Sequence, residues 1–136
     1  PLTGAVWQIK LEADRIIHGS IGEYFAAYVL ETYGVEAHRV DTQYSDIWCR
    51  VGDDVRAVEV KSCSHPSAYG NNVRLTYRFN VKSKKHGWYC FVALDRRLVL
   101  FRSVEDITAA QCCTIRADEF TEENQRISIE KFLESC

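Results

Sequence analysis

The stretch of sequence that decides the fold is residues 45–61, which read SDIWCRVGDDVRAVEVK. Two runs rich in apolar and β-branched residues, 44–51 and 55–61, stand on either side of the turn-forming residues 52–54. Such runs joined by Gly and Asp are typical of a β-hairpin. We therefore predict that the two runs pair as antiparallel strands.

The register of this hairpin decides which polar side chains meet. A two-residue turn at 52–53 places Asp46 directly opposite Glu59, whereas a turn at 53–54 pairs Asp46 with Lys61. Side chains two residues apart in a strand lie on the same face of a sheet. In either register, two carboxylates and one ammonium group therefore share one face of the hairpin.

These groups suit metal-assisted hydrolysis of a phosphodiester. Mg²⁺ prefers a few carboxylates together with waters and phosphate oxygens, so Asp46 and Glu59 are candidate ligands, and the backbone carbonyl of Val60 could complete the set. The ion would lower the pKa of a bound water and stabilise charge on a phosphate. Lys61 is then a candidate for orienting the attacking water or neutralising the transition state. The alternative is a surface Glu–Lys pair with an unrelated Asp.

A third carboxylate precedes the hairpin, on a helix predicted over residues 14–33. Glu23 shares a helix face with small and apolar residues, which indicates that this face points inward. Gly22 beside it would let another backbone segment approach closely. The members of that face are Glu23, Ala26, Ala27 and Leu30. The helix itself is predicted from apolar residues at spacings of three and four: Ile17, Ile21, Tyr24, Phe25, Tyr28 and Val29.

The rest of the chain reads as strands and short helices. Expected strands span residues 35–40, 73–81, 88–94 and 98–102, and expected short helices lie at 103–106 and 129–135. This order predicts an α/β or α+β domain with a mixed central sheet flanked by helices.

Taken together, these pieces resemble the PD-(D/E)XK nuclease superfamily over about residues 15–102. In that superfamily a helix carries an acidic residue and a hairpin carries an Asp and a Glu-x-Lys signature, although Ser45 here replaces the usual Pro. The four matching positions are Glu23, Asp46, Glu59 and Lys61. The resemblance implies a restriction-endonuclease-like core, four catalytic residues at those positions, Mg²⁺-dependent hydrolysis of DNA with Mn²⁺ as a substitute, and a homodimer.

Basic residues are concentrated in one segment. The formal net charge is −2, which on average does not favour a polyanionic partner. Residues 74–102, however, hold eight of the 17 basic residues and a single acidic one. Such a local excess is what contact with DNA phosphates requires, and the alternative is a solvated strand face. The candidate DNA-binding residues are Arg74, Arg78, Lys82, Lys84 and Lys85.

Length and composition limit the class of protein. A chain of 136 residues suits one domain with one core, here a single nuclease domain over 1–136. No apolar run approaches a membrane span, and no signal peptide is visible. Six Cys without a secretion signal favour a reducing, cytoplasmic location, which would be the host cytoplasm if a phage encodes the protein.

The sequence thus predicts a DNA endonuclease, first of all a Holliday junction resolvase that acts on branched DNA. The Gly19-x-x-x-Glu23 pattern in the predicted helix looks like the helix start of the small resolvases of archaea and phages, and 136 residues leave no second domain to read bases. A homodimer, joined through residues 88–94 or through the segment with Trp7, would present two active sites to a four-way junction. Two alternatives stay open: a phage or intron-type homing or restriction-like endonuclease with sequence preference, and a module that binds DNA without cutting it.

Overall fold

The structure of the protein is a computed structural model that describes residues 4–40, 42, 45–68, 74–81, 87–108 and 111–135, with side chains except at 4–12 and 14–16. Within these residues, the helices are α1 (Gly4–Thr32) and α2 (Glu122–Glu134), and two short 3₁₀ turns are η1 (Val104–Asp106) and η2 (Ala117–Glu119). The strands are β1 (Glu36–Arg39), β2 (Ile47–Val51), β3 (Asp54–Cys63), β4 (Thr76–Asn80), β5 (Trp88–Ala93), β6 (Leu98–Ser103) and β7 (Cys112–Arg116).

Five of these strands form one mixed sheet in the order β1-β2-β3-β5-β6. Strands β3 and β5 run parallel, and the other neighbouring pairs in this sheet are antiparallel. Strands β4 and β7 pair with each other as a separate antiparallel ribbon, called the ribbon below. The predicted mixed α/β architecture is confirmed.

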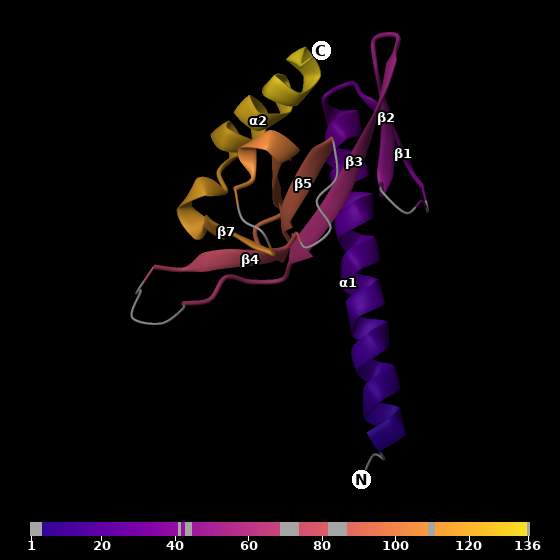
Figure 1. Ribbon diagram of the computed structural model, residues 1–136, viewed down its shortest axis with the longest axis vertical. Coiled ribbons are helices and arrows are strands. Elements are labelled where there is room, and N and C mark those ends of the chain that lie inside the picture. The colour runs from indigo at the N-terminus through magenta and orange to yellow at the C-terminus, as the bar shows by residue number, and fades with distance from the viewer. Residues whose placement is uncertain are drawn as a thin grey trace.

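Different elements cover the two faces of the main sheet (Figure 1). Both helices pack on one face, where Leu30 of α1 and Phe132 of α2 share a core with Val60 of β3. The ribbon packs on the opposite face, where the rings of Phe79 and Phe91 lie 4.8 Å apart. In the part of the chain that the structure describes, helices therefore flank the sheet on one face and the ribbon covers the other.

The hairpin adopts the first of the two registers considered above. Val51 pairs with Asp54, which leaves a two-residue turn that begins at Gly52. Gly52 has a φ of +62°, a left-handed conformation that such turns require and that glycine adopts without strain. Continuing this ladder places Asp46 opposite Glu59, at the end of β2 farthest from the turn.

Helix α1 is longer than predicted and buries its smaller face. It begins at Gly4 rather than at residue 14, because residues 4–13 contain mostly good helix formers and no Pro. Its N-terminal half extends beyond the sheet (Figure 1). The face that includes Ala26 and Leu30 is buried as predicted. The larger apolar stripe from which the helix was predicted is instead largely exposed, at Ile17, Ile21, Tyr24 and Tyr28.

The C-terminal third departs most from the prediction. Strand β7 was not predicted, because its partner β4 lies more than thirty residues away and the run is short. Helix α2 begins at Glu122 rather than at residue 129. Thr121 explains this early start, because its hydroxyl accepts a hydrogen bond of 3.1 Å from the Asn124 N–H and caps the helix.

Helix α2 also protects the edge of the main sheet at β6. The N–H of Val99 donates to Gln125 Oε1 at 2.9 Å, and the N–H of Phe101 donates to Ser128 Oγ at 3.1 Å. These side chains occupy donors that would otherwise be open to another strand.

Strand β5 lies in the interior of the sheet, between β3 and β6. Of the two segments considered for a dimer interface, residues 88–94 therefore have both strand edges already paired within the sheet. In the described part of the chain, neither helix is long and apolar enough to cross a membrane.

The contact between α1 and β3 depends on Gly22. A Cβ added at Gly22 would lie 3.0 Å from Ser62 Cβ and closer still to its hydroxyl, whereas a Cβ at Gly19 on the same helix would meet nothing within 4 Å. We expect Gly22→Ala to lower the free energy of unfolding by about 1–3 kcal/mol through overpacking. Gly19→Ala should raise it by about 1 kcal/mol through helix propensity. Urea unfolding of both variants measures this, and a Gly22→Ala variant as stable as Gly19→Ala would contradict the close packing.

Candidate active site

Asp46 is fixed at the entrance to β2 by two hydrogen bonds to β3. Its N–H donates to the Val58 carbonyl at 3.0 Å. Its Oδ2 accepts a hydrogen bond of 2.8 Å from the Val60 N–H. The carboxylate thus occupies a backbone donor of β3 where the ladder between the two strands ends, which holds Asp46 beside the strand that carries Glu59 and Lys61.

Glu59 and Lys61 lie on the face of β3 opposite to the helices, because Val58 and Val60 occupy the helix face. Lys61 Nζ is 3.1 Å from Glu59 Oε1, and both side chains are half-buried. The structure therefore brings together three of the predicted catalytic side chains, those of Asp46, Glu59 and Lys61.

Burial raises the pKa of Asp46 above its ordinary value. The hydrogen bond from Val60 N–H opposes this shift, the negative charge of Glu59 adds to it, and the charges of Lys61 and Arg39 lower the pKa again. Two carboxylates that repel each other at close range are a set that a divalent cation would stabilise.

The donor set fits Mg²⁺ rather than a softer metal, because its members are hard oxygen atoms. Asp46 and Glu59 would hold the ion, with the carbonyl of Val60, the residue after Glu59 on β3, as the third predicted ligand. Among the described residues, no group of three or more His, Cys, Asp or Glu side chains is arranged to hold a metal ion. The set is therefore a pair of carboxylates, which leaves positions around an ion for water or other oxygen ligands.

Glu23 is connected to the Asp46 cluster by an ion pair with Arg39, a residue that the sequence did not indicate. Glu23 Oε1 lies 3.3 Å from a guanidinium nitrogen of Arg39, at the end of β1, and that guanidinium also stacks 4.0 Å above the ring of Tyr24. Arg39 in turn lowers the pKa of Asp46. Glu23 is therefore linked to Asp46 through Arg39. A single Arg in a four-residue strand carries no sequence pattern that would have revealed this link.

Tyr89 is a second residue that the sequence did not indicate. It pairs with Glu59 across the parallel strands β3 and β5, so both side chains lie on the same face. Burial first, and then the charge of Glu59, raise the pKa of Tyr89 to about 12. Trp48 lies nearer the rim, 45% exposed, with its indole N–H donating to Ser45 Oγ at 2.9 Å.

The candidate DNA-binding residues fall on and around the ribbon. Arg74 and Arg78 are exposed, as the alternating pattern predicted. Arg116 of β7 is exposed on the ribbon as well, paired with Asp118 at 3.4 Å. Lys82, Lys84 and Lys85 lie outside the described residues.

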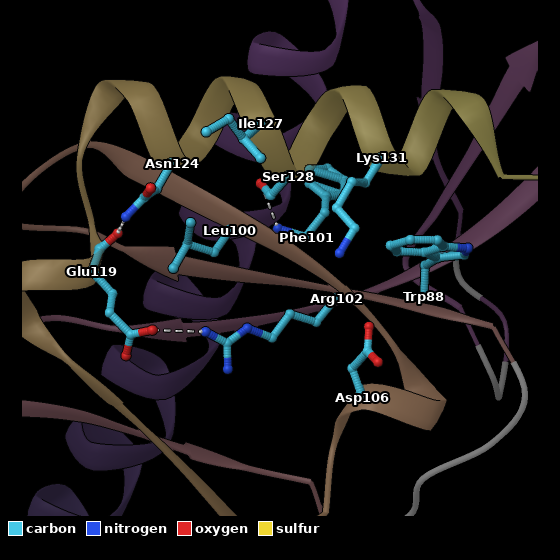
Figure 2. A pocket seen from close by; sticks show the side chains of 10 residues that line it. All are labelled: Trp88, Leu100, Phe101, Arg102, Asp106, Glu119, Asn124, Ile127, Ser128 and Lys131. Carbon is cyan, nitrogen blue, oxygen red and sulfur yellow. Dashed lines mark hydrogen bonds and ion pairs between the residues drawn. The ribbon is translucent and has the colours of Figure 1, made fainter.

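Among the described residues, several cavities lie apart from this cluster. The cavity in Figure 2, of about 400 Å³, lies between β6 and α2, and its polar lining includes an Arg102–Glu119 ion pair of 3.3 Å. Lys131 and Asp106 add one further charge of each sign. Another cavity, of about 360 Å³, lies between α1 and the residues that follow β3 and β5. Neither is lined by the residues that converge at Asp46.

The fold is a mixed α/β core of a kind also found in a nuclease. Among solved structures, the chain is similar to a bacterial homing endonuclease, I-Ssp6803I, with a TM-score of 0.56 and 14% sequence identity over 72% of each chain. The nuclease-like fold implied by the sequence resemblance is thus confirmed. The sequence matches no protein-family model, and no curated protein matches it.

Because the pKa of Asp46 is raised in the folded protein, folding stability should depend on pH. The folded, metal-free protein holds the Asp46 proton more tightly than the unfolded chain does, so stability falls as the pH rises through the interval between the ordinary and the raised pKa. The whole penalty is present once the pH lies above the raised pKa. Asp46→Asn removes the charge and keeps an oxygen for the Val60 N–H. We expect it to raise Tm at pH 7 by a few degrees, since 1 kcal/mol corresponds to roughly 4 °C in a domain of this size.

Thermal unfolding across pH 3–8 measures this difference, which should shrink toward the acid end, where both side chains are neutral. Asp53→Asn, at an exposed turn position, is the matched control and should leave Tm almost unchanged. A lower Tm for Asp46→Asn at pH 7 would show that the carboxylate charge stabilises the metal-free fold.

Proposed function

We propose that this protein is a Mg²⁺-dependent DNA endonuclease of the PD-(D/E)XK type. The observation that carries the proposal is the convergence of Asp46, Glu59 and Lys61 on one face of a sheet whose fold is similar to that of a homing endonuclease. Carboxylates beside an ammonium group are the residues that phosphodiester hydrolysis needs, because negative charge accumulates on the phosphate as the bond breaks.

Each side chain has a distinct part in this proposal. Asp46 and Glu59 hold the cation, and Asp46 is kept in place by the Val60 N–H. When bound, Mg²⁺ supplies charge stabilisation for the phosphate and a water of lowered pKa. Lys61, now 3.1 Å from Glu59, orients the attacking water or neutralises the phosphate. Glu23 keeps Arg39 at the edge of the site, where its positive charge favours the ionised form of Asp46.

Two substrates fit the proposal. The similarity to a homing endonuclease favours a linear duplex with a preferred site. The four-way junction, predicted from the resemblance to small resolvases, stays a second candidate. A panel of labelled junctions, flaps and duplexes incubated with Mg²⁺ separates them, since a resolvase cuts the junction with paired nicks and a homing-type enzyme cuts a duplex.

A homodimer is part of the proposal, because cuts in both strands need two active sites related by symmetry. The exposed apolar stripe of α1 supports it by offering a surface for a second copy. This stripe consists of Ile17, Ile21, Tyr24 and Tyr28.

Two substitutions test the active site directly. Glu59→Gln removes a cation ligand and Lys61→Ala removes the ammonium group, and each should lower the cleavage rate by about 100-fold or more. DNA binding should persist or tighten in Glu59→Gln, because one charge that repels phosphate is gone. Glu36→Gln, on the same sheet and paired with Arg50, is the matched control. Cleavage by both site variants at the wild-type rate would dispose of the proposed site.

The basic ribbon makes a separate prediction about DNA affinity. Replacing both Arg74 and Arg78 by Gln should weaken binding to DNA and lower the slope of log K against log salt by about 0.9 for each phosphate that the protein no longer neutralises. Arg50→Gln with Arg126→Gln removes two exposed arginines from other elements and serves as the control. Fluorescence anisotropy at several salt concentrations gives both slopes. Equal slopes in the two double variants would place the phosphate contacts elsewhere.

A further inference from the structure

The hydroxyl group of Tyr89 is buried without a hydrogen bond. Only 2% of the residue is exposed, and no partner for its hydroxyl is found among the described residues. Glu59 raises the pKa of this hydroxyl through its charge and through side-chain hydrogen bonding, yet the contact falls short of a well-formed hydrogen bond. A buried hydroxyl without a partner costs free energy, so this group calls for an explanation.

Packing does not explain the hydroxyl. The Tyr89 ring stacks on Phe91, with centroids 5.7 Å apart and planes 10° apart, and a phenylalanine ring would do the same. Tyr77, in the same core, shows the usual solution. It is fully buried too, but its hydroxyl donates a hydrogen bond of 2.6 Å to Asp95. Within the described part of this core, the two tyrosines thus differ in whether the hydroxyl has a partner.

The Tyr89 hydroxyl faces the site because of strand register. Tyr89 stands directly across from Glu59 on the same face of the sheet. One oxygen of Glu59 is engaged by Lys61 at 3.1 Å. A carboxylate that turns away from Lys61 to hold a cation needs a new donor to fix its orientation, and a protonated phenol beside it can serve.

We propose that Tyr89 is a positioning residue that donates a hydrogen bond to Glu59 when Glu59 binds a divalent cation, which frees Lys61 for the substrate. This inference rests on the proposed function. It adds a partner exchange in which the ammonium group leaves the carboxylate and the phenol takes its place. No covalent bond changes, and the phenol proton stays on Tyr89.

The test compares Tyr89→Phe with Tyr77→Phe, which removes a hydroxyl that already has a partner. Mn²⁺ affinity is measured by calorimetry without DNA, and Tm is measured without metal. Tyr89→Phe should bind Mn²⁺ about 10-fold more weakly, as loss of a group that orients a metal ligand typically does. Its Tm should equal or exceed that of the wild type. Tyr77→Phe should bind Mn²⁺ normally and unfold at a lower temperature.

Wild-type Mn²⁺ affinity in Tyr89→Phe, or a fall in its Tm like that of Tyr77→Phe, would overturn the inference. The calorimetric comparison keeps the two proposals apart, since it needs no cleavage. If the wild type binds Mn²⁺ but cuts no DNA, the endonuclease proposal fails. The Mn²⁺ affinity of Tyr89→Phe still tests the partner exchange in that case. If the wild type binds no Mn²⁺, both fail.

Discussion

The alternation of side chains along β3 is the constraint on which the rest of the structure depends. Val58 and Val60 must face the helices to complete the larger core, so Glu59 and Lys61 have to lie on the other face. A slip of one residue would exchange the two sets and bury a charged pair under α1. The position of Glu59 and Lys61 on the opposite face therefore follows from the burial of these two valines.

This arrangement costs stability at the site itself. Burial raises the pKa of Asp46, and repulsion by Glu59 adds to this shift. Ionisation of the Asp46 carboxylate is therefore less favourable in the folded protein. The Tyr89 hydroxyl is desolvated and has no partner among the described residues. Both costs lie within one cluster, while Tyr77 in the same core as Tyr89 has its hydrogen bond. Unfavourable charges and unpaired polar groups that cluster at one place are expected of a functional site.

The sequence predicted what is local and missed what is distant. The turn at Gly52 and the period of two along β3 were enough to gather Asp46, Glu59 and Lys61, because register depends on neighbouring residues. Strand β7 and the site residue Arg39 could not be found in this way. The strand acquires its role from β4, more than thirty residues away, and the arginine from an ion pair with α1, which follows no fixed spacing along the sequence.

The net charge of −2 is better understood once the charges are placed on the fold. Helix α2 begins with Glu122 and Glu123, and acidic residues in a first turn stabilise a helix by favourable interaction with its dipole. These acids lie on the element that packs on the helix face of the sheet, whereas the exposed arginines 74 and 78 lie just before and on the ribbon at the opposite face. A polyanion responds to the local field of the surface it approaches, which is screened over roughly 10 Å. The acidic residues that lower the sum therefore do not count against a DNA surface on the face that carries Glu59 and Lys61.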